Sequence, residues 1–354
     1  MKALITAGGH GTRLRPITHT KNKHLIPIAN KPMLNYALEY VRDAGISEVG
    51  IVVNVADTEI EKVFGNGADF DLNISYIPQE GPLGLAHVVK IAESFIGDET
   101  FIFYLGDNIL VGGIKKFIDK FEKDGSNCHL VLSRVTDPQR FGVPEIVNGR
   151  IVSVEEKPQN PKSQFAVTGI YIYDNSIFEA VNNIQPSARG ELEISDAHQY
   201  LLEKRYQISF SEITGWWKDT GKVIDLLEAN RLILENLKAT VSGDVDNQST
   251  VTGNVTIGKG STITNSVLRG PIIVGNNVKI YDAYIGPNTS IADGCRIIAS
   301  EVEYSILMDN SKIEDLHVRM ESSLLGHGVE IIQSSTRPKT HRFMIGDQSR
   351  IRLS

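Results

Sequence analysis

Apolar runs alternate with helical spacings through the first 135 residues of this 354-residue chain. Runs typical of strands cover 2–7, 49–53, 74–79, 100–105 and 128–135. Apolar positions with helical spacing cover 32–44, 58–64, 85–95 and 114–121. This alternation predicts an α/β fold, with a mainly parallel, doubly wound sheet and helices on both faces.

The pattern changes after Val135. Hairpin strands are expected at 140–143 and 150–158, and an alternating strand at 165–173. A helix is expected through about Glu203, with Ser195 or Asp196 as its cap, and another at 223–237. The resulting sheet is Rossmann-like and mixed. Ligands of such sheets bind beyond the carboxyl ends of the strands.

A repeat begins near Val251. Aliphatic residues recur every five or six positions, at 251, 257, 263, 268, 274, 280, 285, 291, 297 and 302. Three short strands per turn, each with one inward aliphatic residue, describe a left-handed parallel β-helix of hexapeptide repeats. The repeat loosens after Val302, and we expect it to continue through 306, 313, 318, 324 and 329.

These patterns predict three regions. Residues 1–240 form the α/β domain, 241–333 the β-helix, and 334–354 a basic tail that docks on its own or a neighbouring subunit, or is solvated. The flat faces and open coil ends of a β-helix need partners, so we expect a homo-oligomer.

Composition limits the partners and the cellular location that we expect for the protein. The net charge of −7 argues against nucleic acid as a partner, and no apolar run has the length of a membrane span. Cys128 and Cys295 lie far apart and outside any metal-ligand spacing, so we expect reduced thiols and a cytoplasmic protein.

A glycine-rich stretch, residues 7–16, follows the first strand. Its three glycines let main-chain N–H groups approach an anion closely. No acidic residue precedes Glu39, whereas six basic residues do. A P-loop and a dinucleotide fingerprint both fail, because Gly11 is not followed by Lys-Ser/Thr and a third glycine is missing. A polyphosphate site fits this stretch better than an ordinary turn does.

Two acidic residues stand near strand ends. Asp107 follows an apolar run, where its carboxylate either meets a cation such as Mg²⁺ or caps a turn. Asp219 either binds metal or caps the next helix. The residues alone leave both alternatives open.

Seven motifs in order over residues 1 to about 237 resemble those of sugar-1-phosphate nucleotidylyltransferases. In particular they resemble the long-form glucose-1-phosphate thymidylyltransferases, which carry a β-helix extension. The motifs are Gly8-Gly9-x-Gly11-Thr12-Arg13-Leu14, Lys23-x-x-x-Pro27, Gln79-x-x-Pro82-Leu83-Gly84, Gly106-Asp107-Asn108, Glu156-Lys157-Pro158, Val167-Thr168-Gly169 and Trp217-x-Asp219-Thr220-Gly221. His10 departs from the small Ser common in the first motif.

The resemblance implies a role for each matched residue. Nucleotide contacts would come from Gly8, Gly9, Gly11, Thr12, Arg13, Gln79, Gly84 and Asp107, with Arg13, Lys23 and Asp107 as catalytic residues. Asp107 and Asp219 would coordinate Mg²⁺. The sugar phosphate would meet Gly142, Glu156, Lys157, Thr168, Gly169 and Arg189.

The implied reaction transfers a thymidylyl group from dTTP to glucose 1-phosphate by Mg²⁺-dependent in-line displacement. A UTP-dependent or other-sugar transferase of the same fold is the nearest alternative. An added acetyltransferase activity, with His317 or His327 as base, and a non-catalytic regulatory subunit are the others.

Overall fold

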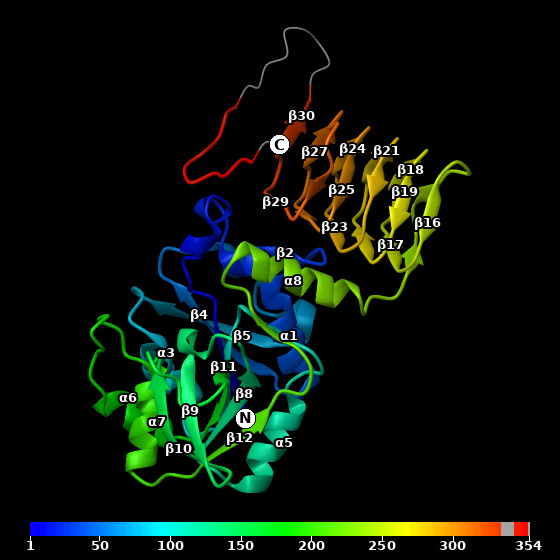
Figure 1. Cartoon of the computed structure of the whole chain (residues 1–354). Helices are drawn as coiled ribbons and strands as arrows, with labels where there is room; N and C mark the ends of the chain where they lie inside the picture. Colours follow the sequence, from blue (N-terminus) through cyan, green and yellow to red (C-terminus); the bar gives the residue numbers. More distant parts are fainter. Residues whose placement is uncertain (334–342, 353–354) are drawn as a thin grey trace. The chain divides into compact units, whose positions relative to one another are not determined.

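A computed structural model describes residues 1–333 and 343–352 (Figure 1). The chain forms two compact units. Unit 1 comprises Met1–His10, Asn22–His24 and Leu34–Asp219, and unit 2 comprises Gly11–Lys21, Leu25–Met33 and the described residues from Thr220 on. The predicted domain boundaries stay predictions, and the parts of the predicted tail at 334–342 and 353–354 lie outside the described residues.

Unit 1 is built on a seven-stranded sheet in the order β12-β8-β11-β6-β1-β4-β5. Its strands are β1 (Lys2–Thr6), β4 (Glu48–Asn54), β5 (Asn73–Gln79), β6 (Phe101–Leu105), β8 (Cys128–Arg134), β11 (Phe165–Tyr173) and β12 (Ile208–Glu212). Strands β6, β1, β4 and β5 are parallel, whereas β11 runs antiparallel to both β6 and β8. The predicted mixed, Rossmann-like sheet is confirmed.

Helices cover both faces of this sheet. They are α1 (Met33–Asp43), α2 (Glu59–Phe64), α3 (Leu85–Ile91), α4 (Glu93–Ile96), α5 (Lys115–Asp124), α6 (Ser176–Asn183) and α7 (Ile194–Glu203). Apolar residues of α3, α6 and α7 share one core with Phe101 and Phe103 of β6. Tyr104 points to the opposite face, because side chains alternate along a strand, and there its ring meets Tyr40 of α1 at 6.3 Å.

Short elements complete unit 1 and its connections. Hairpin strands β9 (Gly142–Val147) and β10 (Arg150–Glu156) pair with each other, as do β7 (Asn108–Leu110) and β13 (Trp217–Asp219). Single 3₁₀ turns are η1 (Thr12–Leu14), η2 (Ile17–His19), η3 (Lys23–Leu25), η4 (Ala68–Phe70) and η5 (Pro138–Arg140).

Three local predictions were wrong. The helix expected at 85–95 is broken at Ala92, whose N–H bonds to the carbonyl of Val89 three residues back, which tightens the turn. Pro32 lies in β3 (Lys31–Pro32), which pairs with β2 (Pro27–Ile28), and the helix starts at Met33. The N-cap of α7 is Glu193, so neither Ser195 nor Asp196 caps it.

The repeat region of unit 2 forms three parallel sheets, seen as the yellow to orange strands of Figure 1. The first contains β14 (Thr240–Val241), β17 (Val255–Ile257), β20 (Ile272–Val274), β23 (Thr289–Ile291), β26 (Ile306–Leu307) and β29 (Leu324–Leu325). The second contains β15 (Asp244–Val245), β18 (Thr262–Thr264), β21 (Lys279–Tyr281), β24 (Arg296–Ile298), β27 (Lys312–Glu314) and β30 (Glu330–Ile332). The third contains β16 (Thr250–Thr252), β19 (Val267–Arg269), β22 (Tyr284–Ile285), β25 (Glu301–Glu303) and β28 (Met320–Glu321).

Register confirms the predicted left-handed β-helix. Ile263 pairs with Ile280 and Ile280 with Ile297, so one coil takes 17 residues there. The inward aliphatic side chains of successive coils stack into one buried core.

Three expected inward positions were wrong. Val318 is exposed, and Leu316 and Met320 pack against the core instead. Leu307 and Leu325 line the core, so their strand neighbours Ile306 and Leu324 face the other side of the sheet.

Helix α8 (Val223–Leu234) packs on the first of these sheets within unit 2. Asn230 is fully buried there. Its Oδ1 accepts the N–H of Ala29 at 2.8 Å and the hydroxyl of Ser290 at 2.6 Å, and its Nδ2 donates to the carbonyl of Asn288 at 3.1 Å. One amide therefore joins α8 to the 25–33 segment and to the β-helix.

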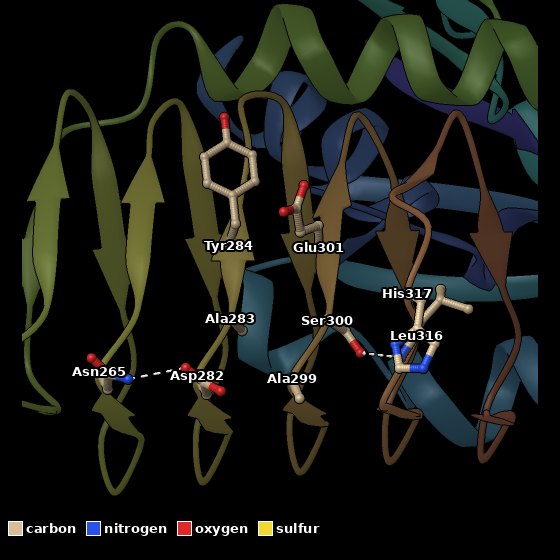
Figure 2. A pocket seen from close by; sticks show the side chains of 9 residues that line it. All are labelled: Asn265, Asp282, Ala283, Tyr284, Ala299, Ser300, Glu301, Leu316 and His317. Carbon is tan, nitrogen blue, oxygen red and sulfur yellow. Dashed lines mark hydrogen bonds between the residues drawn. The ribbon is translucent and has the colours of Figure 1, made fainter. Parts of the chain in front are cut away.

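A polar groove of about 390 Å³ lies on the β-helix, along the corner between the second and third sheets (Figure 2). Ala283 and Ser300 lie along its middle, between a row with Asn265 and Asp282 and a row with Tyr284 and Glu301. His317 lines the groove, but no acyl-transfer chemistry follows from that position alone.

Two further observations concern membrane spans and the cysteines. Among residues 1–333 and 343–352, no helix is long and apolar enough to cross a bilayer. Cys128 and Cys295 are both buried, and neither forms a disulfide. The cytoplasmic location and the homo-oligomer stay predictions.

Replacing Asn230 with Leu should destabilise unit 2 by about 1–3 kcal/mol, because two donors and one acceptor lose their buried partner. Asn183→Leu is the matched control, since its amide bonds only to the carbonyl of Glu179 on the exposed surface of α6. Denaturant unfolding measures both. Equal effects of the two changes would contradict the joining role of Asn230.

Candidate functional site

A cavity of about 210 Å³ opens in unit 1 near the carboxyl ends of the sheet strands. Its walls come from loops, strands and helices that are far apart in the sequence. They are Leu85, Leu105, Asp107, Asn108, Arg140, Phe141, Gly142, Glu156, Lys157, Val167, Gly169, Tyr171, Ile194, Ser195, Trp217 and Asp219. Six predicted site residues therefore share one cavity: Asp107, Gly142, Glu156, Lys157, Gly169 and Asp219.

Asp107 lies directly after β6, and its carboxylate forms an ion pair with the ammonium of Lys23. Both side chains are largely buried. Burial disfavours the charged form of Asp107, but Lys23, His24 and a hydrogen bond from Asn108 outweigh it and lower the pKa of the carboxyl group. Asp107 is therefore an anion at neutral pH, held beside a cation.

His24 is a close neighbour of this pair. It received no predicted role from the sequence. The main-chain N–H of His24 donates to Oδ1 of Asn22 at 2.7 Å, and its ring Nδ1 lies 2.9 Å from the same oxygen. Nδ2 of Asn22 donates to the carbonyl of Ala7 at 3.1 Å. Burial lowers the pKa of His24 to about 4, so the ring is neutral. Because the ring also approaches Gly9 and Gly106, it packs between the glycine loop and the Asp107 turn.

Asp219 reaches the cavity from the β7–β13 ribbon. In that ribbon Asp219 pairs with Asn108, so it lies opposite the residue that directly follows Asp107. The N-cap of the following helix is Lys222, which excludes Asp219 from the capping role considered above.

The two carboxylates fit a divalent cation of the Mg²⁺ type. Within the described residues, no cluster of three or more His, Cys, Asp or Glu side chains could hold a metal by itself. Mg²⁺ is usually bound through one or two carboxylates together with substrate phosphates and water, and Asp107 and Asp219 supply that donor set.

Glu156 lines the cavity from the end of β10. Its Oε1 pairs with Lys157 at 2.9 Å and lies 3.6 Å from Arg189, while its Oε2 accepts the hydroxyl of Ser195 at 2.8 Å. A Cβ at Gly142 would lie 2.6 Å from that hydroxyl, so only glycine leaves Ser195 room to hold Glu156. Sequence reasoning considered Ser195 only as a cap.

Thr168 and Arg189 lie outside the wall of this cavity. The hydroxyl of fully buried Thr168 donates to the carbonyl of Val131 at 2.8 Å. The guanidinium of Arg189 is bound mainly to Glu193, at 2.7 Å, and is 44% exposed. Their contacts with a sugar phosphate stay predictions.

Apart from Asp107, the predicted nucleotide residues also lie outside the cavity wall. Gly8 and Gly9 follow β1 in unit 1, whereas Gly11, Thr12 and Arg13 belong to unit 2, where Thr12 and Arg13 are exposed. Nε2 of Gln79 contacts Nδ1 of His87 at 3.2 Å. Gly84 has a φ of +99°, and a Cβ there would lie 2.3 Å from the carbonyl oxygen of Leu192. That close approach requires glycine whether or not a base binds beside it.

Asn108, Trp217, Arg140 and Phe141 line the cavity but received no predicted role. Asn108 and Trp217 stood within quoted motifs, and Arg140 and Phe141 directly precede Gly142. Their positions next to predicted site residues were the sequence signal that could have identified them.

Comparison with known proteins places these features in a family. The model described as nucleotidyl transferase matches residues 2–236. A glucose-1-phosphate thymidylyltransferase from Streptomyces antibioticus is 48% identical over 356 residues, which cover 100% of this chain and 99% of the relative. One from Streptomyces griseus is 45% identical over 355 residues, with 100% of both chains covered.

A solved structure agrees with these matches. A crystal structure from Bacillus anthracis, described as a glucose-1-phosphate thymidylyltransferase in complex with sucrose, has a TM-score of 0.62 and 38% identity. It matches 66% of this chain and 94% of its own. The chain therefore belongs to the nucleotidyl transferase family, and these two Streptomyces relatives, which match its whole length, are glucose-1-phosphate thymidylyltransferases.

Proposed function

We propose that the protein transfers a thymidylyl group from dTTP to glucose 1-phosphate, which yields dTDP-glucose and pyrophosphate. The observation that carries this proposal is the shared cavity. Asp107, Asp219, Glu156 and Lys157 line it together, and Lys23 pairs with Asp107. Full-length relatives that bear this activity in their names support the choice of substrates.

The chemistry needs no nucleophile from the protein. An oxygen of glucose 1-phosphate attacks the α-phosphorus of dTTP, the bond from that phosphorus to the bridging oxygen breaks, and pyrophosphate leaves. The protein must hold two mutually repelling anions in line and stabilise the charge that develops between them.

Each predicted residue has a place in this scheme. Main-chain N–H groups of Gly8, Gly9, Gly11 and Thr12 would bind the triphosphate, and Arg13 would offset charge on the leaving pyrophosphate. Gln79 would pair with the pyrimidine edge beside Gly84. Lys23 would donate to the phosphates at the reacting centre.

Residues on the sugar side complete the site. Glu156 would accept hydrogen bonds from sugar hydroxyls, and Lys157 would bind the sugar phosphate. Gly142, Thr168 and Gly169 would shape the pocket, and Arg189 would reach a phosphate. Homologous enzymes use a divalent metal ion. We propose Mg²⁺, held by Asp107 and Asp219, and when bound it would supply positive charge to the phosphate oxygens.

Removing either member of the buried ion pair should abolish most turnover. Lys23→Met and Asp107→Asn should each lower kcat by about 10²-fold or more, because each removes a group that stabilises or organises the transition state. Pyrophosphate release measures the rate. Lys162→Met is the control, since its ammonium pairs with Glu145 on the exposed surface. Near-normal turnover of both site variants would sink the assignment.

Glu156→Gln should raise the KM for glucose 1-phosphate about 10-fold or more and change the KM for dTTP far less. The carboxylate is an acceptor on both oxygens, whereas an amide presents one acceptor and one donor. Glu155→Gln is the matched control, because Glu155 is exposed one residue earlier. Equal changes in both KM values would contradict a sugar role for Glu156.

A matrix of dTTP and UTP against glucose 1-phosphate and mannose 1-phosphate separates the proposal from its nearest alternative. We expect dTTP with glucose 1-phosphate to give the highest kcat/KM. Gln79 alone does not detect the thymine methyl group, so faster turnover of UTP would reassign the nucleotide. Faster turnover of mannose 1-phosphate would reassign the sugar.

A further inference from the structure

Asn108 links Asp107 to Trp217 inside the cavity wall. Its side chain is buried, its Nδ2 donates to Oδ1 of Asp107 at 2.9 Å, and its Oδ1 accepts the indole N–H of Trp217 at 2.6 Å. The ammonium of Lys23 bonds to the other oxygen of Asp107, Oδ2. Both oxygens of the Asp107 carboxylate therefore have a fixed donor.

The indole ring sets the direction of the Asn108 amide. An indole nitrogen can only donate, so the amide oxygen must face Trp217 and the NH₂ group must face Asp107. The reversed amide would place its oxygen against the carboxylate and its NH₂ group against the indole N–H. Both contacts would be repulsive, and in a buried site neither has water to relieve it.

Neighbouring groups fix where this amide stands. A Cβ at Gly169 would lie 2.7 Å from Nδ2 of Asn108, so glycine there provides the space that the amide occupies. The hydroxyl of Tyr104 donates to the main-chain carbonyl of Asn108 at 2.8 Å. The hydroxyl of Tyr40 donates to the carbonyl of Leu110 at 2.7 Å, which holds the other end of β7.

The indole ring is itself held in place. Trp217 is 9% exposed, and its ring meets that of Phe141 edge to face, with centroids 5.6 Å apart and an interplanar angle of 64°. Its backbone pairs with β7, opposite Leu110. The donor that orients Asn108 therefore belongs to a packed, two-stranded frame.

We propose that Trp217 is a positioning residue of the transfer site: through Asn108, its indole N–H orients the Asp107 carboxylate. The inference deepens the proposed function and rests on it, because the orientation matters only if Asp107 acts there. Trp217 does this work as a hydrogen-bond donor in addition to its packing.

The test replaces Trp217 with 3-benzothienylalanine, in which sulfur takes the place of the indole N–H at nearly unchanged shape. Without that donor the amide loses its preferred direction. We expect kcat to fall and the half-saturating Mg²⁺ concentration to rise, each on the order of tenfold, with the KM for glucose 1-phosphate within about twofold of wild type. The same replacement at neighbouring Trp216 is the matched control and should change none of these values.

A second readout does not depend on turnover. Calorimetry of Mg·dTTP binding without sugar phosphate should show weaker binding, on the order of tenfold, for the Trp217 replacement and not for the Trp216 replacement. Trp217→Phe, which also removes the donor, provides the same comparison if the unnatural residue is poorly tolerated. A loss of thermal stability with unchanged Mg²⁺ dependence would assign Trp217 to packing alone and overturn the inference.

The two proposals fail in different ways. If Asp107→Asn is inactive while the Trp217 replacement matches wild type in kcat and in Mg²⁺ dependence, the positioning role is wrong and the proposed function stands. If Asp107→Asn remains active, the role of Asp107 in the proposed function is wrong, and the positioning role falls with it.

Discussion

The arrangement of the site depends on one constraint, which is that the largely buried carboxylate of Asp107 must be stabilised. A carboxylate away from water is costly unless a cation and hydrogen-bond donors meet it, and Asp107 meets both in Lys23 and Asn108. The residues that satisfy it are far apart in the chain. They come together because β1 and β6 are neighbours in the sheet, with Thr6 opposite Leu105, so the loops after both strands leave from the same edge.

The same principle governs Glu156 in the cavity wall. Glu156 has Lys157 and Ser195 as partners, and Lys23 has Asp107. Cations and anions of the site are therefore already paired with one another. In the proposed reaction, phosphates and a metal ion would replace these partners, so few charges would be left unpaired and the desolvation cost of binding would be lower.

The sequence predicted the structure correctly where the spacing of apolar residues is compatible with only one kind of fold. The alternation of strands and helices fixed the class of the first unit, and the spacing of aliphatic residues fixed the coils of the second. It failed where the deciding contact is distant in sequence. Nothing near Ala92 breaks a helix, nothing near Val318 shows that its side chain is exposed, and nothing near Ser195 shows that its hydroxyl bonds to Glu156. The motifs named candidate site residues. The contacts around them, such as those of His24 with Asn22 and of Trp217 with Asn108, required the folded chain.

The coil register has a consequence for how such a chain can change over time. Each coil forms its ladder bonds only with the coil before and the coil after it, as Ile280 does with Ile263 and Ile297. Loss or duplication of a 17-residue coil away from the strands that contact α8 would thus remove or add one layer, about 4.8 Å thick, and leave the ladder pattern of the other coils intact. The β-helix can therefore change in length by whole coils, while the coils at its ends keep their own structure.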